Sequence, residues 1–133
     1  MTAYLVDAVG MLRYLVDALP DEADEAFYRA EQGVDSIRST DVQIAEVLYQ
    51  VSRSQEVAGI ELEGTPNEAL RLLVADGPVD IASIDEQVLA VYGSISDVYT
   101  MHDGLLIAAH RVLGTDSIIS KDEDFSKVET VWE

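Results

Sequence analysis

The chain has 133 residues, 48% of them hydrophobic, which predicts one domain with a buried core and excludes wholesale disorder. It has no cysteine, which excludes disulfides and thiolate metal sites. No apolar stretch reaches the length of a membrane span, and the first residues lack the basic and apolar segments of a secretory signal. We therefore expect a single domain over residues 1–133, without membrane association, in the cytoplasm.

The net charge of -18 arises from 26 acidic and 8 basic residues, and the acids are spread along the whole chain. Repulsion on this scale destabilises a compact state in dilute salt. In molar salt the Debye length falls to about 3 Å, so the repulsion is largely screened. The charge therefore indicates adaptation to a salty cytoplasm, as in a halophilic archaeon. A basic binding partner is the alternative explanation.

In the first half of the chain, short apolar runs alternate with segments of helical periodicity. Pro20 ends the first helical segment, and Gly33 ends the second. Thr40 and Gln43 have the spacing of a capping box, in which each side chain bonds the backbone N–H of the other. The predicted elements are a strand at 3–7, helices at 9–19 and 21–31, a strand at 34–38 and a helix at 40–51.

The second half continues this alternation after residues 52–65, the segment that the sequence predicts least well. The predicted elements are a helix at 66–75, a strand at 79–83, helices at 85–92 and 100–113 around a loop at 93–99, and strands at 117–119 and 128–131. Short apolar strands that alternate with helices indicate an α/β layer fold with a mostly parallel sheet. In such sheets, binding sites form outside the carboxyl ends of the strands.

Four acidic residues, Asp7, Glu46, Asp103 and Asp122, stand beside apolar runs. Carboxylates in such places are costly unless something compensates for their charge, and a divalent cation is one such compensation. Asp7 ends a predicted strand and Asp122 lies just beyond another, whereas Glu46 and Asp103 fall on predicted helices. This distribution is compatible with one shared cleft.

Each of these acids also has a structural explanation. Asp7 could cap the helix that follows it. Asp103 stands three residues after Thr100 and could complete a capping box. Ser120 and Glu123 have the same spacing, so Asp122 could belong to a polar turn. The candidates for a metal-binding role and for a capping role are therefore the same residues.

Glu46, the remaining acid, also has a structural explanation, and the sequence offers no stronger candidate site of another kind. Glu46 could be a solvated helix residue, because Val42 and Gln50, its neighbours one turn away, offer no ion pair. His102 and His110 are the only histidines, and neither has a partner at zinc-ligand spacing. The sequence has no glycine-rich phosphate loop and no evident Ser-His-Asp set.

Taken together, four segments resemble those of a known family. In chain order they are Leu5–Asp7, Ala45–Val47, the run from His102 to Ala109 and the run from Ile119 to Phe125. Their order is similar to that of PIN-domain nucleases, and more narrowly to that of VapC-type toxins, over nearly the whole chain. The resemblance implies a PIN-like three-layer α/β/α fold with a mostly parallel central sheet.

The resemblance also implies a catalytic role for the four acids, because PIN nucleases hold one or two Mg²⁺ or Mn²⁺ ions with clustered carboxylates. By this likeness Asp7 and Asp103 are direct metal ligands. Asp122 completes the set directly or through water, and Glu46 orients the attacking water or joins a second metal. Asp124 competes with Asp122, which we prefer because the family pattern places an acid three residues before the Phe that closes the motif.

The implied substrate is RNA, hydrolysed at a phosphodiester bond, and the implied partners are a small antitoxin protein and a second copy of the chain. The net charge opposes RNA binding, since affinity normally comes from Lys and Arg that neutralise phosphates. Bound metal and high salt would offset this repulsion. Lys121 is either a phosphate contact or a solvated lysine.

Three positions depart from the family pattern. Ala8 and Val9 stand where the family has Ser or Thr and then often Asn or Ser, so a hydroxyl that would support the metal site is missing. This leaves open a catalytically weakened PIN-like module that binds protein or RNA. Gly104 replaces the more usual Ala, a change we expect to be sterically mild. A receiver-like fold is disfavoured, because only a single acid ends the first strand.

We expect folding and RNA cleavage both to improve from low salt towards molar KCl at constant Mg²⁺, because salt screens the long-range repulsion among the acids. A basic nuclease should instead lose RNA affinity as salt rises. Circular dichroism and cleavage rates across a KCl series measure the two effects. Steady loss of activity in protein that stays folded would contradict the halophilic interpretation.

Overall fold

Five parallel strands form the central sheet of the protein, whose structure, a computed structural model, describes residues 1–122 and 128–133. The strand order is β5-β2-β1-β6-β7, so β1 lies in the middle. The strands are β1 (Ala3–Val6), β2 (Ser36–Thr40), β5 (Val79–Ala82), β6 (Ser117–Ile119) and β7 (Thr130–Val131). The predicted parallel sheet is confirmed.

Helices lie between β1, β2, β5 and β6 in the chain. They are α1 (Ala8–Leu15), α2 (Asp21–Glu31), α3 (Asp41–Ser52), α4 (Pro66–Leu70) with the π-helical turn η1 (Arg71–Ala75), α5 (Glu86–Ile95) and α6 (Met101–Leu113). An antiparallel hairpin of β3 (Glu56–Val57) and β4 (Ile60–Glu61) lies between α3 and α4 in the chain. Within the ranges that the structure describes, no helix combines the length and the apolar character needed to span a membrane.

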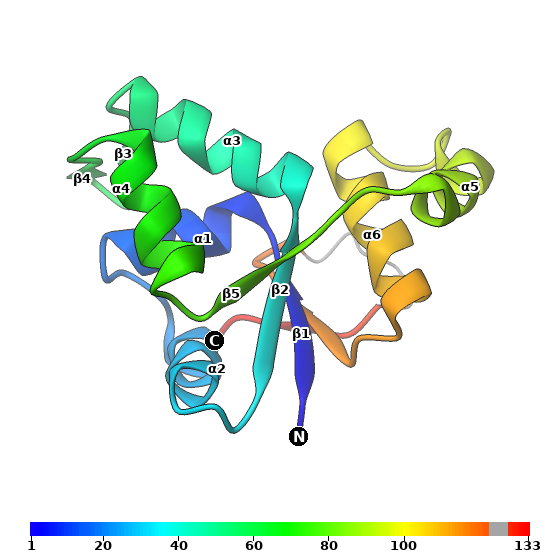
Figure 1. Ribbon diagram of the computed structural model, residues 1–133, viewed down its shortest axis with the longest axis horizontal. Coiled ribbons are helices and arrows are strands. Elements are labelled where there is room, and N and C mark those ends of the chain that lie inside the picture. The colour runs from blue at the N-terminus through cyan, green and yellow to red at the C-terminus, as the bar shows by residue number, and fades with distance from the viewer. Residues whose placement is uncertain (123–127) are drawn as a thin grey trace.

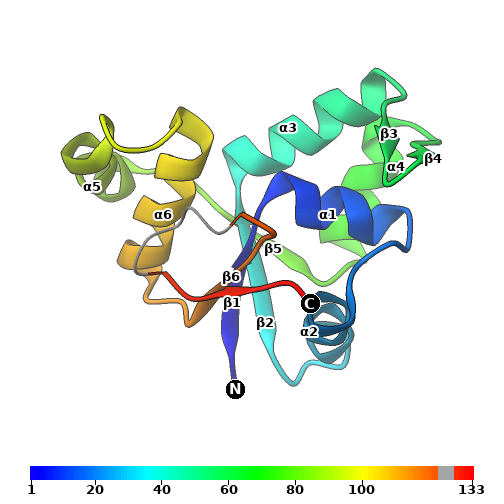
Figure 2. The same cartoon turned by 180° about the vertical axis from the view of Figure 1, so that it is seen from behind.

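The side chains of β1 alternate between two halves of the core. Val6 belongs to the half formed with α1, α2, α3 and α4, whereas Leu5 belongs to the half formed with α5 and α6. Ile119 and Ile118, their register partners on β6, divide in the same way. Figures 1 and 2 show α1–α4 to one side of the sheet and α5 and α6 to the other. The three-layer α/β/α arrangement is therefore as predicted.

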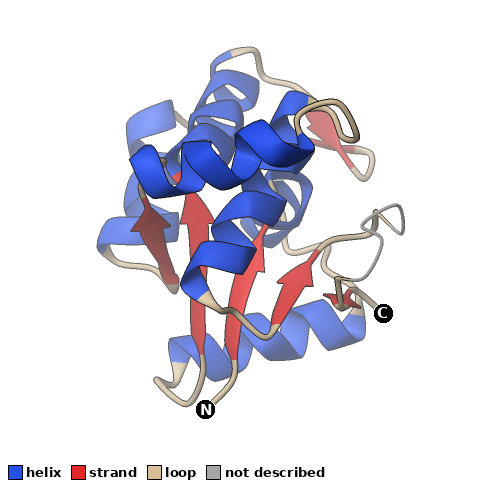
Figure 3. Cartoon of the chain, turned by 90° about the vertical axis from the view of Figure 1, so that its right-hand side faces the viewer, coloured by secondary structure: helices blue, strands red, loops and turns tan. Residues whose placement is uncertain are grey.

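The carboxyl ends of the central strands meet the N-terminal ends of three helices. Figure 1 shows α1 and α3 starting where β1 and β2 end, with the first turn of α6 beside them. In Figure 3 the arrowheads of the central strands point toward this end of the molecule. From β1 the chain adds β2 and then β5 on one side, and after α5 and α6 it places β6 on the other side of β1. The direction in which strands are added therefore reverses between β1 and β6. A crevice is expected at such a reversal.

Two predicted helix ends are wrong. The first helix ends at Leu15 rather than at residue 19, because Asp17 takes a left-handed conformation with φ 54°. The N–H of Ala18 then turns back to the carbonyl oxygen of Arg13 at 2.9 Å. Residues 93–99, predicted as a loop, are helical as far as Ile95, whose side chain is buried against α6. Burial of an apolar side chain therefore extends this helix beyond a glycine that disfavours it.

The strand predicted at 34–38 lies two residues later, at β2. Asp35 is not part of a strand, because its carboxylate holds two other segments. It accepts hydrogen bonds from the backbone N–H of Thr2 and from Nε of Arg29, both at 2.8 Å. Together the two bonds hold the residue before β1 against the end of α2. The hydrogen bond from Thr2 first, and then the one from Arg29, hold the pKa of the Asp35 carboxyl below its usual range.

Gly10 and Gly104 let helices approach their neighbours closely. A Cβ on Gly10 would lie 2.6 Å from Cγ2 of Val6, a fully buried side chain, and 3.3 Å from Oδ1 of Asp7. A Cβ on Gly104 would lie 2.8 Å from Cε1 of Tyr92. The expectation that Gly in place of Ala at position 104 is sterically mild is therefore wrong, since the glycine makes room for this ring.

We expect Gly10→Ala to lower the free energy of unfolding by about 1–2 kcal/mol, because an overpacking cost of about 1–3 kcal/mol exceeds the gain in helix propensity of about 1 kcal/mol. Gly93→Ala is the matched control, since Gly93 also lies inside a helix but its added Cβ would meet nothing within 4 Å. The control should be slightly stabilised. Urea unfolding in high KCl measures both, and equal responses would contradict the close approach of α1 to β1.

Candidate metal centre at the carboxyl edge of the sheet

Asp7 lies at the carboxyl end of β1 and caps α1. Its Oδ1 accepts a hydrogen bond from the N–H of Gly10 at 2.8 Å, so the predicted capping role is confirmed. Its Oδ2 accepts a hydrogen bond from the hydroxyl of Ser120 at 2.6 Å. Val6 pairs with Ile119 in the parallel register of β1 and β6, and this register places Asp7 and Ser120 side by side just beyond the two strands.

Ser120 links two of the predicted acids. It is almost fully buried, and its Oγ also accepts a hydrogen bond from the backbone N–H of Asp122 at 3.0 Å. The turn after β6 therefore carries Asp122 toward Asp7. Sequence reasoning missed Ser120 as a site residue and considered it only as a cap for Glu123, which lies outside the described residues. Its place directly after a buried strand, beside Asp7 in a parallel pair, is the signal that could have found it.

Asp103 enters the same region from the first turn of α6. Thr100 caps this helix, accepting a hydrogen bond from the backbone N–H of Asp103 at 3.4 Å. The side chain of Thr100 lowers the pKa of the Asp103 carboxyl, and the neighbouring carboxyl of Asp122 raises it. Two carboxyl groups at hydrogen-bonding range require a proton or a cation between them when both would otherwise be charged.

The electrostatics of the three aspartates reflect this crowding. Burial raises the pKa of the Asp7 carboxyl, hydrogen bonds from Ser120 and Gly10 lower it, and the charges of Asp103 and Asp122 raise it further. The pKa of Asp103 is raised by burial first and then by Asp122. The ionised cluster is thus unfavourable by itself, and anything that neutralises it stabilises the fold.

Glu46, the fourth predicted acid, lies on α3. Its side chain is partly buried, and its Oε1 accepts a hydrogen bond from Nε2 of Gln50, one turn along the helix, at 3.1 Å. The structure therefore gathers Asp7, Asp103 and Asp122 and places Glu46 on the neighbouring helix. The competing Asp124 lies outside the described residues.

Gln43 is a further residue of this region that sequence reasoning missed. The predicted capping box is only half formed, because Thr40 accepts from the backbone N–H of Gln43 at 3.1 Å but the Gln43 side chain does not return the bond. Instead its amide bonds the N–H of Ala8 at 2.7 Å and the carbonyl oxygen of His102 at 3.2 Å. The capping-box spacing of Thr40 and Gln43 did not indicate these partners, which are distant in the sequence.

The donor set fits a hard divalent cation, because carboxylate and hydroxyl oxygens are the ligands such ions prefer. Among the described residues, however, no three His, Asp or Glu side chains already form a finished metal cage. Asp7, Asp103 and Asp122 therefore form an acidic cluster of suitable donor atoms and not a preformed metal cage. Lys121 and His102, which adjoin Asp122 and Asp103 in the sequence, are both exposed.

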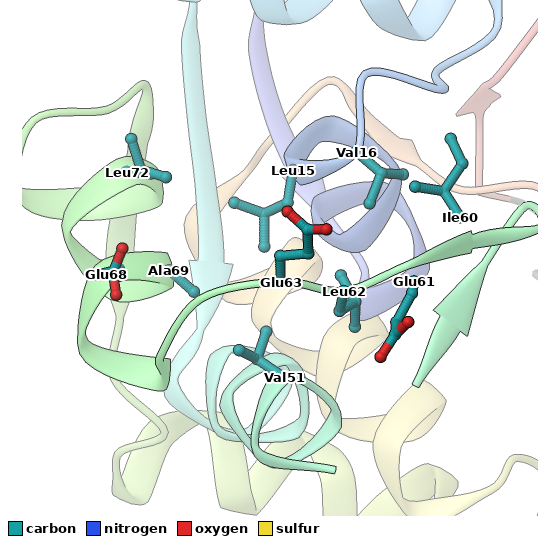
Figure 4. A pocket seen from close by; sticks show the side chains of 10 residues that line it. All are labelled: Leu15, Val16, Val51, Ile60, Glu61, Leu62, Glu63, Glu68, Ala69 and Leu72. Atoms are coloured by element: carbon teal, nitrogen blue, oxygen red, sulfur yellow. The ribbon is translucent and has the colours of Figure 1, made fainter. Parts of the chain in front are cut away.

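An apolar pocket lies elsewhere, between α1, α3, α4 and the segment after β4 (Figure 4). Its volume is about 360 Å³. Its apolar lining consists of Leu15, Val16, Val51, Ile60, Leu62, Ala69 and Leu72, and its acidic lining consists of Glu61, Glu63 and Glu68. None of the three aspartates lines it, so the pocket and the carboxylate cluster are separate features.

The fold is similar to that of several solved structures. VapBC2 from Rickettsia felis, solved bound to a DNA fragment from its promoter, matches with a TM-score of 0.72 and 13% identity over 98% of this chain and 99% of that one. VapBC-1 from nontypeable Haemophilus influenzae gives 0.66 and 15% identity over 97% and 96%. VapC20 of Mycobacterium tuberculosis, a sarcin-ricin loop cleaving toxin, gives 0.62 and 12% identity over 94% and 93%.

A comparison with curated proteins gave no match. The family model of the PIN domain matches residues 4–131, and this range runs from β1 to β7. It includes the three clustered aspartates and Glu46. The match extends over nearly the whole chain, so this protein belongs to the PIN domain family.

Proposed function

We propose that this protein is a divalent-metal-dependent endoribonuclease and the toxin of a toxin–antitoxin pair. The observation that carries the proposal is the crowding of Asp7, Asp103 and Asp122, which three separate elements bring to one edge of the sheet. Burial raises the pKa of Asp7 and Asp103, as the neighbouring charges of the cluster also do. Membership of the PIN domain family supports a nuclease. Mg²⁺ or Mn²⁺ is the proposed cofactor.

In this proposal Asp7 and Asp103 hold the cation, and Asp122 completes its ligands directly or through water. Ser120 keeps the Asp7 carboxylate oriented, since its hydroxyl donates to Oδ2 and leaves the other lone pairs of that carboxylate available. A bound divalent cation would neutralise the phosphate and lower the pKa of a water. Glu46 would orient the attacking water from α3 and accept its proton at a carboxylate oxygen.

A protein partner is the second part of the proposal. The Rickettsia felis and Haemophilus influenzae structures are VapBC structures, and the Mycobacterium tuberculosis protein is described as a sarcin-ricin loop cleaving toxin. We propose by likeness that RNA is the substrate here, with a small antitoxin and a second copy as partners in the cytoplasm. The net charge of -18 favours an antitoxin with basic segments.

The competing proposal is a catalytically weakened module that binds protein or RNA. It is favoured by Ala8, whose methyl group offers no polar atom beside the carboxylate of Asp7. A gene for a short DNA-binding protein directly upstream would favour the toxin, and metal-dependent cleavage would exclude the weakened module.

We expect Asp7→Asn and Asp103→Asn to abolish RNA cleavage while the protein stays folded, because each change removes a ligand charge and keeps the shape of the side chain. Asp122→Asn should also remove most activity. Asp124→Asn should leave most of it. Cleavage of a mixed RNA pool in high KCl with Mn²⁺ measures the rates, and circular dichroism checks the fold.

The matched control for these variants is Asp116→Asn, since Asp116 accepts a hydrogen bond from the N–H of Ala3 at the opposite end of β1. It changes the same charge without touching the cluster. Full activity of Asp103→Asn would remove this residue from the proposed site. Activity lost at Asp124 and retained at Asp122 would reverse the choice of the last acid.

We expect Mg²⁺ or Mn²⁺ to raise the melting temperature, because a cation that binds only the folded state stabilises it by mass action and relieves the repulsion in the cluster. The response should be largely lost in Asp103→Asn. Melting curves at increasing concentrations of the divalent ion and fixed high KCl measure this response, with metal-free samples in EDTA as the reference. Identical metal responses in the variant and the wild type would show that the site is wrongly assigned.

A further inference from the structure

Gln43 connects the two helices that carry Asp7 and Asp103. It lies in the first turn of α3, and only 4% of its surface is exposed. Its Oε1 accepts a hydrogen bond from the N–H of Ala8 at 2.7 Å, and its Nε2 donates one to the carbonyl oxygen of His102 at 3.2 Å. A single side-chain amide therefore bonds the residue after Asp7 and the residue before Asp103.

The chemistry of its partners fixes the orientation of this amide. A backbone N–H can only donate and a carbonyl oxygen can only accept, so the oxygen of the amide must face Ala8 and its NH₂ group must face His102. The backbone N–H of Gln43 is held in turn by the hydroxyl oxygen of Thr40 at 3.1 Å. Among neutral side chains of this length, only Gln offers an acceptor and a donor on one rigid group.

The helices that Gln43 joins lie on opposite faces of the sheet. α1 packs in the half of the core that contains Val6, and α6 packs in the half that contains Leu5. The sheet itself therefore does not bring the starts of these helices into direct contact. The like charges of Asp7 and Asp103 favour their separation. The buried amide of Gln43 opposes this separation, since breaking either bond would leave a buried polar group unsatisfied.

We propose that Gln43 is a positioning residue that sets the spacing of Asp7 and Asp103 and thereby the affinity of this edge of the sheet for a divalent cation. The inference rests on the proposed metal-dependent function. Groups that orient metal ligands without touching the metal typically contribute about 10–100-fold to metal affinity. Because Ala8 has no polar side-chain atom, only its backbone can form a hydrogen bond with Gln43.

The test is Mn²⁺ binding to the full chain by isothermal titration calorimetry, without RNA, in high KCl. Gln43→Met keeps the length of the side chain and removes both hydrogen bonds, so it should weaken Mn²⁺ binding about tenfold or more. Gln43→Glu keeps an acceptor for Ala8 but sets a carboxylate oxygen against the carbonyl oxygen of His102. Its added charge alone would favour a cation, so weaker binding in this variant would identify the loss of the His102 bond.

Leu73→Ala is the control for general destabilisation, because Leu73 is fully buried in η1 and belongs to no part of the proposed site. It should lower the melting temperature and leave Mn²⁺ affinity unchanged. In RNA cleavage, the Gln43 variants should need about tenfold more Mn²⁺ for half-maximal rate, with a smaller loss of rate at saturating Mn²⁺. A fold-wide effect would instead lower the rate without shifting the Mn²⁺ requirement.

The failure of this inference differs from the failure of the proposed function. Wild-type protein that binds no Mn²⁺ would overturn both. Wild-type binding matched by equal affinity in Gln43→Met and Gln43→Glu would overturn the positioning role and leave the metal-dependent function standing. Should Gln43→Met not fold, Gln43→Leu, which also removes both hydrogen bonds and adds no charge, carries the same decision.

Discussion

The repulsion among Asp7, Asp103 and Asp122 is the interaction on which the rest of this structure depends. Burial and the neighbouring charges raise the pKa of Asp7 and Asp103, so the cluster costs folding free energy whenever it is ionised. The apolar core on both faces of the sheet offsets this cost, and hydrogen bonds from Gly10 and Ser120 hold the Asp7 carboxylate in place. Strain of this kind concentrates at functional sites, where a ligand can relieve it.

Electrostatic repulsion among acidic side chains also acts across the whole surface. The chain carries 26 acids against 8 bases, and the described residues form two ion pairs, Arg29–Asp35 and Arg71–Asp76. Of these, only the first has a buried carboxylate, and it fixes the start of the central strand. Solvent ions must therefore screen much of the surface charge, whereas the clustered aspartates are partly shielded from solvent, so that salt screens their repulsion less.

Several polar side chains near the cluster form hydrogen bonds with groups of other elements. Ser120 joins β6 to Asp7, Gln43 joins α3 to α1 and α6, and Ser39 donates to the carbonyl oxygen of Val6 at 2.6 Å. All three side chains are buried. Buried polar networks of this kind are costly when any bond is missing, so they specify one arrangement of the strand and helix ends. The carboxylates are thereby held on a rigid frame.

The sequence by itself determined the α/β alternation, the short parallel strands and the order of the acids, because these depend on local periodicity, apolar runs and caps. It located β6 at residues 117–119 and predicted the capping role of Asp7. Only the tertiary structure decided that Ser120 and Gln43 lie beside the clustered aspartates, and that Glu46 bonds Gln50. The physical reason is that the hydrogen bonds of Ser120 and Gln43 join residues far apart in the chain, where the pairing of strands and the packing of helices choose the partner.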